Sequence, residues 1–292
     1  DNQAAGLPLH NQPPHHLTLV RLGEQETRFV WAVHHIILDG WTESLLYREL
    51  FAIYAAMGRG ETAVLPEPVP FETFIRWQQQ QDRTAAEPFW RTRLAGFAVP
   101  TPLTVDLGQR APRHAGQHTG ELRRQLPDEL YAALQQFGRR HGLTLGTLLQ
   151  AAWGLLLSRY SGEPDVLFGT MMSGRVPQLP GVDQIAGVLI NPVPVRTQID
   201  PTDTVLPWLQ TFQANLLALQ AHETVPLAQV QNWSGVPGDQ PLFETLLVLE
   251  NYPRQRRAAN GQLKIRDYFS YERTNYPLTL RLVPDDGLDV IL

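Results

Sequence analysis

The sequence predicts a mixed α/β fold of the α+β kind, because short β-prone segments alternate with longer segments of helical periodicity. Residues 29–33 are apolar and β-prone, as expected of a strand that enters a core. After Asp39 and Gly40, apolar residues recur at i, i+4, i+7, i+8 and i+11, which is one face of an amphipathic helix: Leu46, Leu50, Ile53, Tyr54 and Met57. With 292 residues, 43% of them hydrophobic, the chain is long enough for one large or two modest domains.

The first part of the chain, residues 1–99, is predicted to form one lobe. Its expected elements are strands at 17–22 and 29–33 and helices at 43–57 and 71–95. Gly58 and Gly60 are expected to end the first of these helices, because glycine is common just beyond a helix C-terminus.

Residues 100–120 are predicted to be a linker or a long crossover, since proline, glycine and histidine are concentrated there. His114 and His118 are four residues apart, a spacing that suits metal ligands on a helix. The surrounding prolines and glycines argue against a helix, so no metal site is predicted.

The remainder, residues 121–292, is predicted to form a second lobe that is incomplete at its end. The expected helices cover 128–141, 144–160 and 204–221, and the expected strands cover 166–171, 188–195, 242–251, 262–271, 278–283 and 288–292. Asp203 is a candidate N-cap for the helix that begins at residue 204, because aspartate accepts hydrogen bonds from the free amides of a first turn.

Composition excludes several classes of function. The formal net charge of −5 does not provide the basic surface of a nucleic-acid-binding protein. The absence of cysteine excludes disulfides, thiolate metal sites and a cysteine nucleophile. No apolar run approaches the roughly 18 to 20 residues that span a bilayer, and no signal peptide is recognisable. We therefore expect a cytoplasmic protein without nucleic-acid or membrane partners, and an internal fragment of a longer chain.

The segment from Trp31 to Trp41 is the strongest candidate for a reactive site. It places His34, His35 and then Asp39-Gly40 between an expected strand and an expected helix. If the two histidines are in extended conformation, their side chains point to opposite faces. One of them would then be structural, and only the other could face a cleft.

The spacing His-His-x-x-x-Asp-Gly at residues 34–40 resembles the signature of condensation domains of nonribosomal peptide synthetases, in the superfamily of chloramphenicol acetyltransferase. Further segments resemble motifs of this family in the expected order: 71–77, 89–96, 173–175, 187–191, 195–196, 222–227 and 241–253. Leu189 and Pro192 depart from the pattern, because the family commonly has an aromatic residue and a threonine there.

The resemblance implies two similar lobes that form a V with a central tunnel. It also implies that the amine of an acceptor aminoacyl thioester attacks a donor acyl or peptidyl thioester. Both substrates would be tethered to 4'-phosphopantetheine on donor and acceptor peptidyl carrier domains, with an adenylation domain adjacent. No cofactor or metal bound by the domain itself is expected.

The resemblance also assigns roles to residues of the histidine motif. His35 is the expected catalytic group, either as a general base or by stabilising the tetrahedral intermediate. His34 is expected to pack at the end of the strand. Gly40 would allow a backbone conformation or a close approach that a Cβ forbids, and Trp41 is a candidate for lining the tunnel.

Asp39 has two interpretations. It could orient His35 as in a catalytic triad, or it could pair with an arginine and hold the loop, which the family favours. Arg175 is the first candidate partner, through a bidentate bond, and Arg196 the second. Two further residues are candidates for lining the tunnel or the substrate: Ser173 and Asn191.

Several alternatives remain open. An epimerisation domain, another acyltransferase of the same fold and a catalytically silent carrier-docking module share the motif or the fold. A serine hydrolase is not indicated, because no Gly-x-Ser-x-Gly is present, and His-Glu-x-x-His of zinc proteases is also missing.

Overall fold

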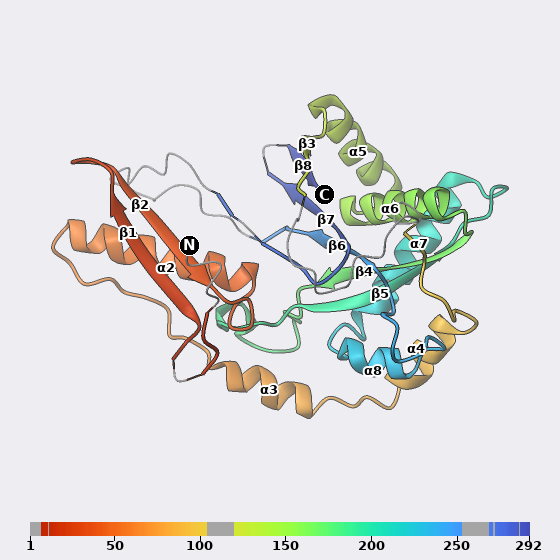
Figure 1. The fold of residues 1–292 in the computed structure, drawn as a ribbon, viewed down its shortest axis with the longest axis horizontal. Helices are drawn as coiled ribbons and strands as arrows, with labels where there is room; N and C mark the ends of the chain where they lie inside the picture. Colours follow the sequence, from red (N-terminus) through yellow and green to blue (C-terminus); the bar gives the residue numbers. More distant parts are fainter. Residues whose placement is uncertain (1–6, 11, 104–119, 253–268, 271, 286) are drawn as a thin grey trace. The chain divides into compact units, whose positions relative to one another are not determined.

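The computed structural model describes residues 7–10, 12–103, 120–252, 269–270, 272–285 and 287–292 (Figure 1). The chain divides into two compact units, and each is described by itself. Unit 1 consists of Asp1–Gln79, Arg175–Leu189 and Tyr252–Tyr268, and unit 2 of Gln80–Gly174, Ile190–Asn251 and Phe269–Leu292. Neither unit is continuous in sequence, so segments distant along the chain fold together.

Unit 1 contains an antiparallel hairpin of β1 (His15–Arg21) and β2 (Thr27–Val33), paired from His15 opposite Val33 to Arg21 opposite Thr27. Helix α2 (Gly40–Gly58) follows and lies beside this hairpin (Figure 1). The ring of Trp31 on β2 meets Tyr47 of α2 edge-on at 6.0 Å, and Tyr47 stacks on Phe51 at 6.3 Å. Aromatic contacts thus join the predicted strand to the predicted helix.

The predicted helix after Gly40 is confirmed, but its predicted apolar face is not the buried one. Leu50, Ile53, Tyr54 and Met57 are all exposed, with Met57 at 71%. A two-stranded sheet offers a helix only one narrow surface, and α2 meets it on the side of Tyr47 and Phe51.

A small core in unit 1 joins α3 (Phe71–Gln79) to the segment Arg175–Leu189. Its buried members are Phe74, Val176, Leu179, Val182, Ile185 and Leu189. A short 3-10 helix (Val182–Gln184) lies within the segment, and Ile185 forms a parallel bridge with Val69. This core keeps a segment more than a hundred residues away in sequence beside the start of α2.

Unit 2 is built on a six-stranded sheet of order β3-β8-β7-β6-β4-β5, in which β6 is parallel to both β4 and β7 and the other pairs are antiparallel. Its strands are β3 (Arg123–Gln125), β4 (Asp165–Met172), β5 (Asn191–Gln198), β6 (Thr245–Leu249), β7 (Leu278–Pro284) and β8 (Leu288–Ile291). Its helices are α4 (Ala86–Leu94), α5 (Asp128–His141), α6 (Leu145–Ser161), α7 (Val205–Gln220) and α8 (Leu227–Asn232).

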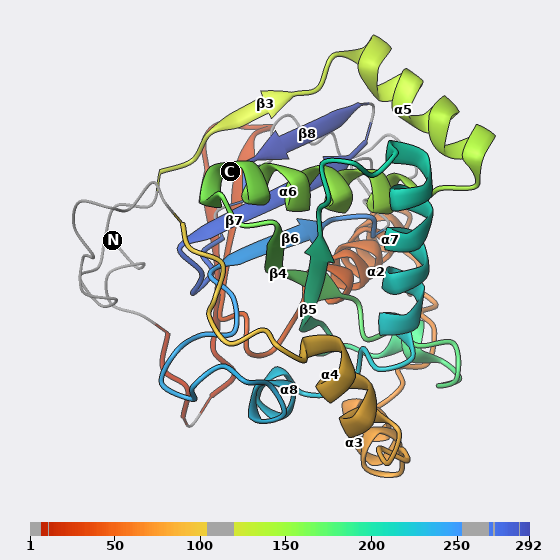
Figure 2. The same cartoon turned by 90° about the vertical axis from the view of Figure 1, so that its right-hand side faces the viewer.

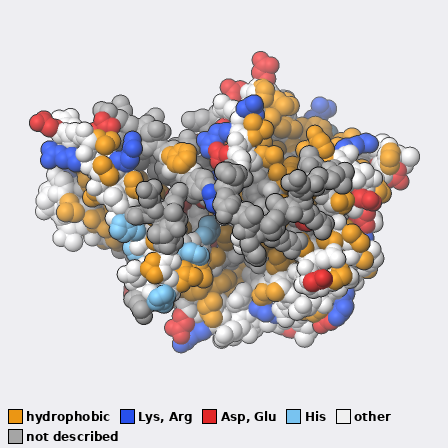
Figure 3. Space-filling view, in the orientation of Figure 1, with side chains coloured by type: hydrophobic (Ala, Val, Ile, Leu, Met, Phe, Trp, Pro, Cys, Tyr) orange, Lys and Arg blue, Asp and Glu red, His pale blue; other side chains and the backbone are white. Residues whose placement is uncertain are grey.

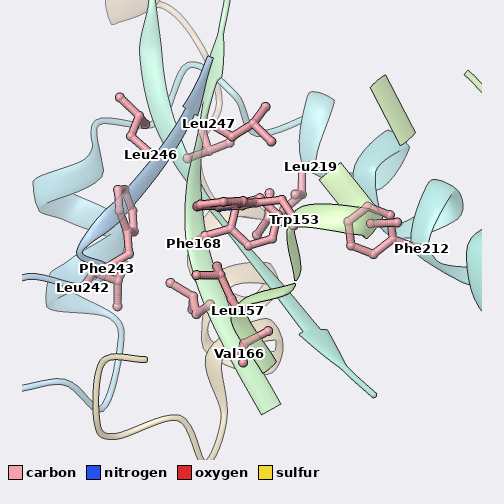
Figure 4. Close-up of a cluster of buried hydrophobic side chains, with 14 of the residues drawn as sticks. Trp153, Leu157, Val166, Phe168, Phe212, Leu219, Leu242, Phe243, Leu246 and Leu247 are labelled. Carbon is pink, nitrogen blue, oxygen red and sulfur yellow. The ribbon is translucent and has the colours of Figure 1, made fainter. Parts of the chain in front are cut away.

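Helix α6 lies over the sheet of unit 2, flanked by α5 and α7 (Figure 2). Between helix and strands lies the main core, in which Phe168 of β4 packs with Trp153 and Leu157 of α6 (Figure 4). Phe168 is fully buried. The helix predicted at 144–160 is confirmed, but only part of its 3.6-residue apolar face packs on the sheet: Leu148 and Trp153 are buried, whereas Leu156 and Tyr160 are 45% and 64% exposed. The mixed α/β fold class is confirmed as well.

The compact units differ from the predicted lobe boundaries at residues 99 and 121. Trp90, Leu94 and Phe97 belong to the core of unit 2, so the change of unit comes at Gln79–Gln80. Most of the predicted linker, residues 104–119, lies outside the described residues, and so do His114 and His118.

Three element predictions need comment. The helix predicted at 71–95 is two helices, because the Asp82 carboxylate accepts a hydrogen bond from the Thr84 amide and forms a turn between them. The N-cap of α7 is Thr204, not Asp203, whose amide is used in a turn with Asp200. Most of the strand predicted at 262–271 lies outside the described residues.

Within the described part of the chain, no helix has both the length and the apolar character that crossing a membrane requires.

Candidate functional site

The two histidines follow β2 in a turn, not in a strand. The His34 amide donates to the Pro14 carbonyl at 2.8 Å, and the Ile37 amide donates to the His34 carbonyl at 3.2 Å. The premise that both residues are extended is therefore wrong, because pairing ends at Val33 and the chain turns at once. Strand alternation cannot decide which histidine is reactive.

Both imidazoles are exposed, and histidine side chains are visible on the surface of the part that holds the hairpin and α2 (Figure 3). The Nδ1 atom of His34 accepts a hydrogen bond from the Ile36 amide at 3.1 Å. His34 is thus held by its own turn, and the prediction that it packs at the end of the strand is wrong. The assignment of His35 as the reactive histidine stays a prediction.

Asp39 ends this loop and is fully buried. It is the N-cap of α2: its Oδ1 accepts from the Thr42 amide at 2.8 Å. Its Oδ2 accepts from the Leu189 amide at 3.0 Å. A carboxylate at a helix N-terminus is stabilised by the helix dipole and satisfies a free amide. The sequence reasoning missed this capping role, although aspartate before an apolar helical run is its usual signal.

The predicted ion pair between Asp39 and Arg175 is present, with side chains only 0% and 2% exposed. The Nη2 atom of Arg175 lies 3.1 Å from Oδ1 and 3.3 Å from Oδ2 of Asp39. The expected two-nitrogen fork is not formed, because Nη1 instead donates to the carbonyls of Val182 and Ile185 at 2.8 and 3.0 Å. Arg175 therefore ties the end of the histidine loop to the turn at residues 182–185.

Burial decides the electrostatics of this pair. Burial lowers the pKa of the Arg175 guanidinium from its ordinary value, and Asp39 offsets part of that effect. A buried charge is tolerated only with a partner and hydrogen bonds to its remaining donors or acceptors. The carbonyls of the 182–185 turn and the amides of Thr42 and Leu189 provide these bonds.

The two alternatives for Asp39 are not equally supported. Among the described residues, Asp39 accepts hydrogen bonds from Thr42, Leu189 and Arg175, and His35 is not one of its donors. Arg196, the second candidate partner, is instead paired with Asp165 at 2.6 Å. The structure thus favours a structural carboxylate over one that orients the imidazole.

Close packing, rather than a strained backbone, explains the glycine of the motif. A Cβ on Gly40 would lie 2.6 Å from Cζ of Tyr252 and 2.8 Å from its hydroxyl oxygen. Trp41 places its ring 5.4 Å from the guanidinium carbon of Arg175, and its Nε1 donates to the Asp183 carbonyl at 3.2 Å. Both residues therefore pack against the elements that hold the histidine loop, and the prediction that Trp41 lines a tunnel stays a prediction.

The other two candidate lining residues differ from each other. Ser173 is exposed. Asn191 in unit 2 donates its side-chain amide to the carbonyls of Glu223 and Val225, each at 2.7 Å, and so fixes the loop before α8.

Glu223 itself is 8% exposed, and burial raises the pKa of its carboxyl group to about 7. The sequence reasoning missed this group, and the segment 222–227, half of which is polar, gives no clear signal for a buried acid.

No group of three or more metal-ligating side chains that could hold an ion occurs among the residues described. The site therefore consists of an exposed imidazole pair on a turn, followed by a buried ion pair and a capped helix. Such a site offers imidazole nitrogens that can donate or accept hydrogen bonds to a reactant, on a loop with a fixed end.

Comparison with known proteins places this chain in a family. The sequence profile described as Condensation domain matches residues 1–290. A subunit of the linear gramicidin synthase of Brevibacillus parabrevis is 36% identical over 291 residues, which are 99% of this chain and 6% of that protein. Chondramide synthase cmdD of Chondromyces crocatus is 38% identical over 290 residues, 99% of this chain and 7% of that protein. The chain thus spans a small part of these relatives.

Solved structures agree in fold. The X-domain from teicoplanin biosynthesis matches with a TM-score of 0.77 at 23% identity, covering 97% of this chain and 67% of that chain. The first condensation domain of the CDA synthetase matches with a TM-score of 0.74 at 18% identity, covering 95% and 61%. At these identities the likeness concerns the fold alone.

Proposed function

Because the chain belongs to the condensation domain family of nonribosomal peptide synthetases, we propose that it forms an amide bond between two thioester-bound substrates. The amine nitrogen of the acceptor attacks the carbonyl carbon of the donor thioester, which gives a tetrahedral intermediate. The C–S bond then breaks, and the proton lost by the amine balances the thiolate that leaves as a thiol. The donor acyl or peptidyl group ends on the acceptor.

One observation supports this proposal most strongly: an exposed histidine pair precedes a fully buried, ion-paired aspartate at the family's spacing. A thioester is already activated, so positioning two tethered reactants removes much of the barrier. The Asp39–Arg175 pair supplies a rigid support for the loop that carries His35. This is the support that such positioning requires.

His35 is the proposed catalytic residue. It either accepts the proton of the attacking amine or donates a hydrogen bond to the tetrahedral intermediate. An imidazole serves both purposes because it has a donor and an acceptor nitrogen. His34 has its Nδ1 engaged with the Ile36 amide, which leaves it less available for proton transfer.

The substrates and partners follow from the proposed reaction. Donor and acceptor are proposed to be tethered to 4'-phosphopantetheine on two peptidyl carrier domains, with an adenylation domain nearby in the same cytoplasmic synthetase. The gramicidin and chondramide synthases are many times longer than this chain, which supports such a multidomain setting.

The experiment uses the full-length protein that contains this chain, with donor and acceptor carrier domains loaded as thioesters. Amide-linked product on the acceptor carrier is measured by mass spectrometry. His35→Ala should lower its rate by roughly 100-fold or more. The controls are His34→Ala, which should lose less, and His16→Ala on the exposed strand β1, which should lose nothing.

Near wild-type amide formation by His35→Ala would contradict the catalytic assignment. A second candidate function is a recruitment module without catalysis. It is favoured by the fold match, at a TM-score of 0.73, to the X-domain in complex with OxyB from teicoplanin biosynthesis.

Carrier binding without any amide product would support that candidate. Inversion of the acceptor residue, detected by chiral analysis, would support an epimerisation domain.

A further inference from the structure

Thr42 belongs to the first turn of α2, and nothing in the family signature at residues 34–40 assigns it a role. Its side chain is buried, with 1% exposed. We infer that Thr42 is a positioning residue for the proposed condensation reaction, and that its hydroxyl locks the start of α2 to the backbone of Gly187. This inference rests on the proposed function, but its structural part can be tested without turnover.

The hydroxyl of Thr42 uses its full hydrogen-bonding capacity. It donates to the Gly187 carbonyl at 2.8 Å and accepts from the Gly187 amide at 3.0 Å. It also accepts from Nη2 of Arg175 at 3.2 Å. One donor and two acceptor sites are all that a hydroxyl has. Replacing Thr42 with an apolar residue of the same shape would therefore leave both backbone polar groups of Gly187 without this partner.

Gly187 cannot easily move to find other partners. Its φ is +155°, and a Cβ there would meet the ring of Phe71 from α3. Two residues further on, the Leu189 amide donates to Asp39 at 3.0 Å. Thr42 and Asp39 thus hold one short stretch of chain at two points, and both residues belong to the start of α2.

The network places Thr42 between the histidine loop and the segment Arg175–Leu189. Nη2 of Arg175 is shared between Asp39 and Thr42. Losing the hydroxyl frees Gly187 and removes one acceptor from this nitrogen. Nη2 of Arg175 then keeps its hydrogen bond to Asp39 and loses its hydrogen bond to Thr42. We expect the loop that carries His35 to lose its fixed position as a result.

Unit 2 contains a matched threonine. Thr147 is also 1% exposed, and it stands at the same place in α6 that Thr42 has in α2, three residues after the N-cap. The amide of each donates to the cap side chain, at 3.0 Å in α6 and 2.8 Å in α2. The Thr147 hydroxyl bonds to the Gln213 side chain at 2.9 Å, within unit 2. Thr147→Val therefore makes the same chemical change at the same depth.

The test compares Thr42→Val, Thr42→Ser and Thr147→Val in the full-length protein with loaded carriers. Thr42→Val should lower kcat for amide formation about ten-fold or more, with KM for the acceptor carrier unchanged. Thr42→Ser keeps the hydroxyl and should restore kcat. Thr147→Val should lower Tm by a similar amount but leave kcat near wild type. Equal kcat losses in the two valine variants would show that Thr42 acts only through general stability and would overturn the inference.

Hydrogen exchange separates this inference from the proposed function. In Thr42→Val, peptides that contain Gly187 should exchange faster than in wild type, whereas Thr42→Ser should retain protection. This outcome does not depend on any condensation activity. Unchanged protection at Gly187 in Thr42→Val would overturn the proposed lock even if the wild-type protein forms amides.

Discussion

The chain contains two arginine–aspartate pairs that differ in burial and in what they join. Arg175 and Asp39 are 2% and 0% exposed and 136 residues apart. Arg196 and Asp165 are 13% and 31% exposed and 31 residues apart. The first pair connects the histidine loop to a distant segment, whereas the second connects the neighbouring strands β4 and β5.

The pKa values of the two guanidinium groups shift in opposite directions. Burial lowers the pKa of Arg175, whereas hydrogen bonding to Asp165 raises the pKa of Arg196. A buried pair is costly to desolvate and costly to break, so it contributes geometry more than net stability. A partly exposed pair costs little to form and little to lose. The buried pair is the one beside the proposed reactive group.

The largest loss of unfolding free energy is expected when the buried Asp39–Arg175 pair is broken. Arg175→Met leaves the Asp39 carboxylate buried without its counter-charge, which typically costs about 3 to 5 kcal/mol. Chemical denaturation should report this loss as a lower unfolding free energy for the full-length domain. A loss below about 1 kcal/mol would mean that water replaces the guanidinium and that the pair is not a structural support.

The next largest loss of unfolding free energy is expected for Gly40→Ala, which tests how tightly the end of the histidine loop is packed. Gly40→Ala forces Tyr252 to move, because its ring carbons lie 2.6 and 2.7 Å from the added Cβ, and overpacking of this kind costs about 2 kcal/mol. Gly23→Ala is the control, since a Cβ there meets nothing within 4 Å. Equal unfolding free energies for the two variants would contradict close packing at Gly40. Shortening Tyr252 to Leu in the Gly40→Ala background should recover part of the loss.

A smaller effect is expected at the second ion pair. Arg196→Met loses its bonds to Asp165 and to the carbonyls of Arg93 and Ala95, at 3.1 and 2.7 Å. The Asp165 carboxylate is partly exposed and can be hydrated instead, so we expect the unfolding free energy to fall by about 1 to 2 kcal/mol. Amide formation should be unaffected at temperatures where the variant is folded. A loss as large as that of Arg175→Met would remove the distinction between the two pairs.

The last expected effect depends on pH and concerns Glu223, whose pKa is raised by burial alone. Its pKa of about 7 lies above the ordinary 4.5, so the unfolded chain releases this proton first as the pH rises. Stability is therefore lost between about pH 4.5 and 7. Glu223→Gln stays neutral, so its unfolding free energy should rise relative to that of wild type across this range, by an amount that reaches about 3 kcal/mol near pH 7. A difference between the two proteins that does not change with pH would contradict the raised pKa.

The sequence predicts local elements better than the contacts between them. The helix at 128–141 has the predicted bounds, because Gly142 ends it in a left-handed conformation and Leu126-Pro127 precedes it. Helix α2 begins at Gly40 rather than at the predicted Glu43, because Asp39 caps it and periodicity alone does not reveal a cap.

For the site, the resemblance to the family implies the pairing of Asp39 with Arg175 ahead of Arg196, and the pair with Arg175 is present. It cannot predict that Thr42 binds Gly187, because no residue of the motif at 34–40 indicates a partner for the Thr42 hydroxyl. Nor can it show that Leu50 and Met57 are exposed, because an apolar stripe indicates a helix face but not what covers it. Contacts between distant segments depend on tertiary packing, which periodicity does not report.

The most direct test of the central claim is a pair of double-mutant cycles on the unfolding free energy. One cycle combines Asp39→Asn with Arg175→Met, and the other combines Asp165→Asn with Arg196→Met. If the buried pair holds the histidine loop, the first cycle gives a coupling of about 2 to 3 kcal/mol and the second gives less than about 1 kcal/mol. Additive losses in the Asp39–Arg175 cycle, to within about 0.5 kcal/mol, would contradict the claim.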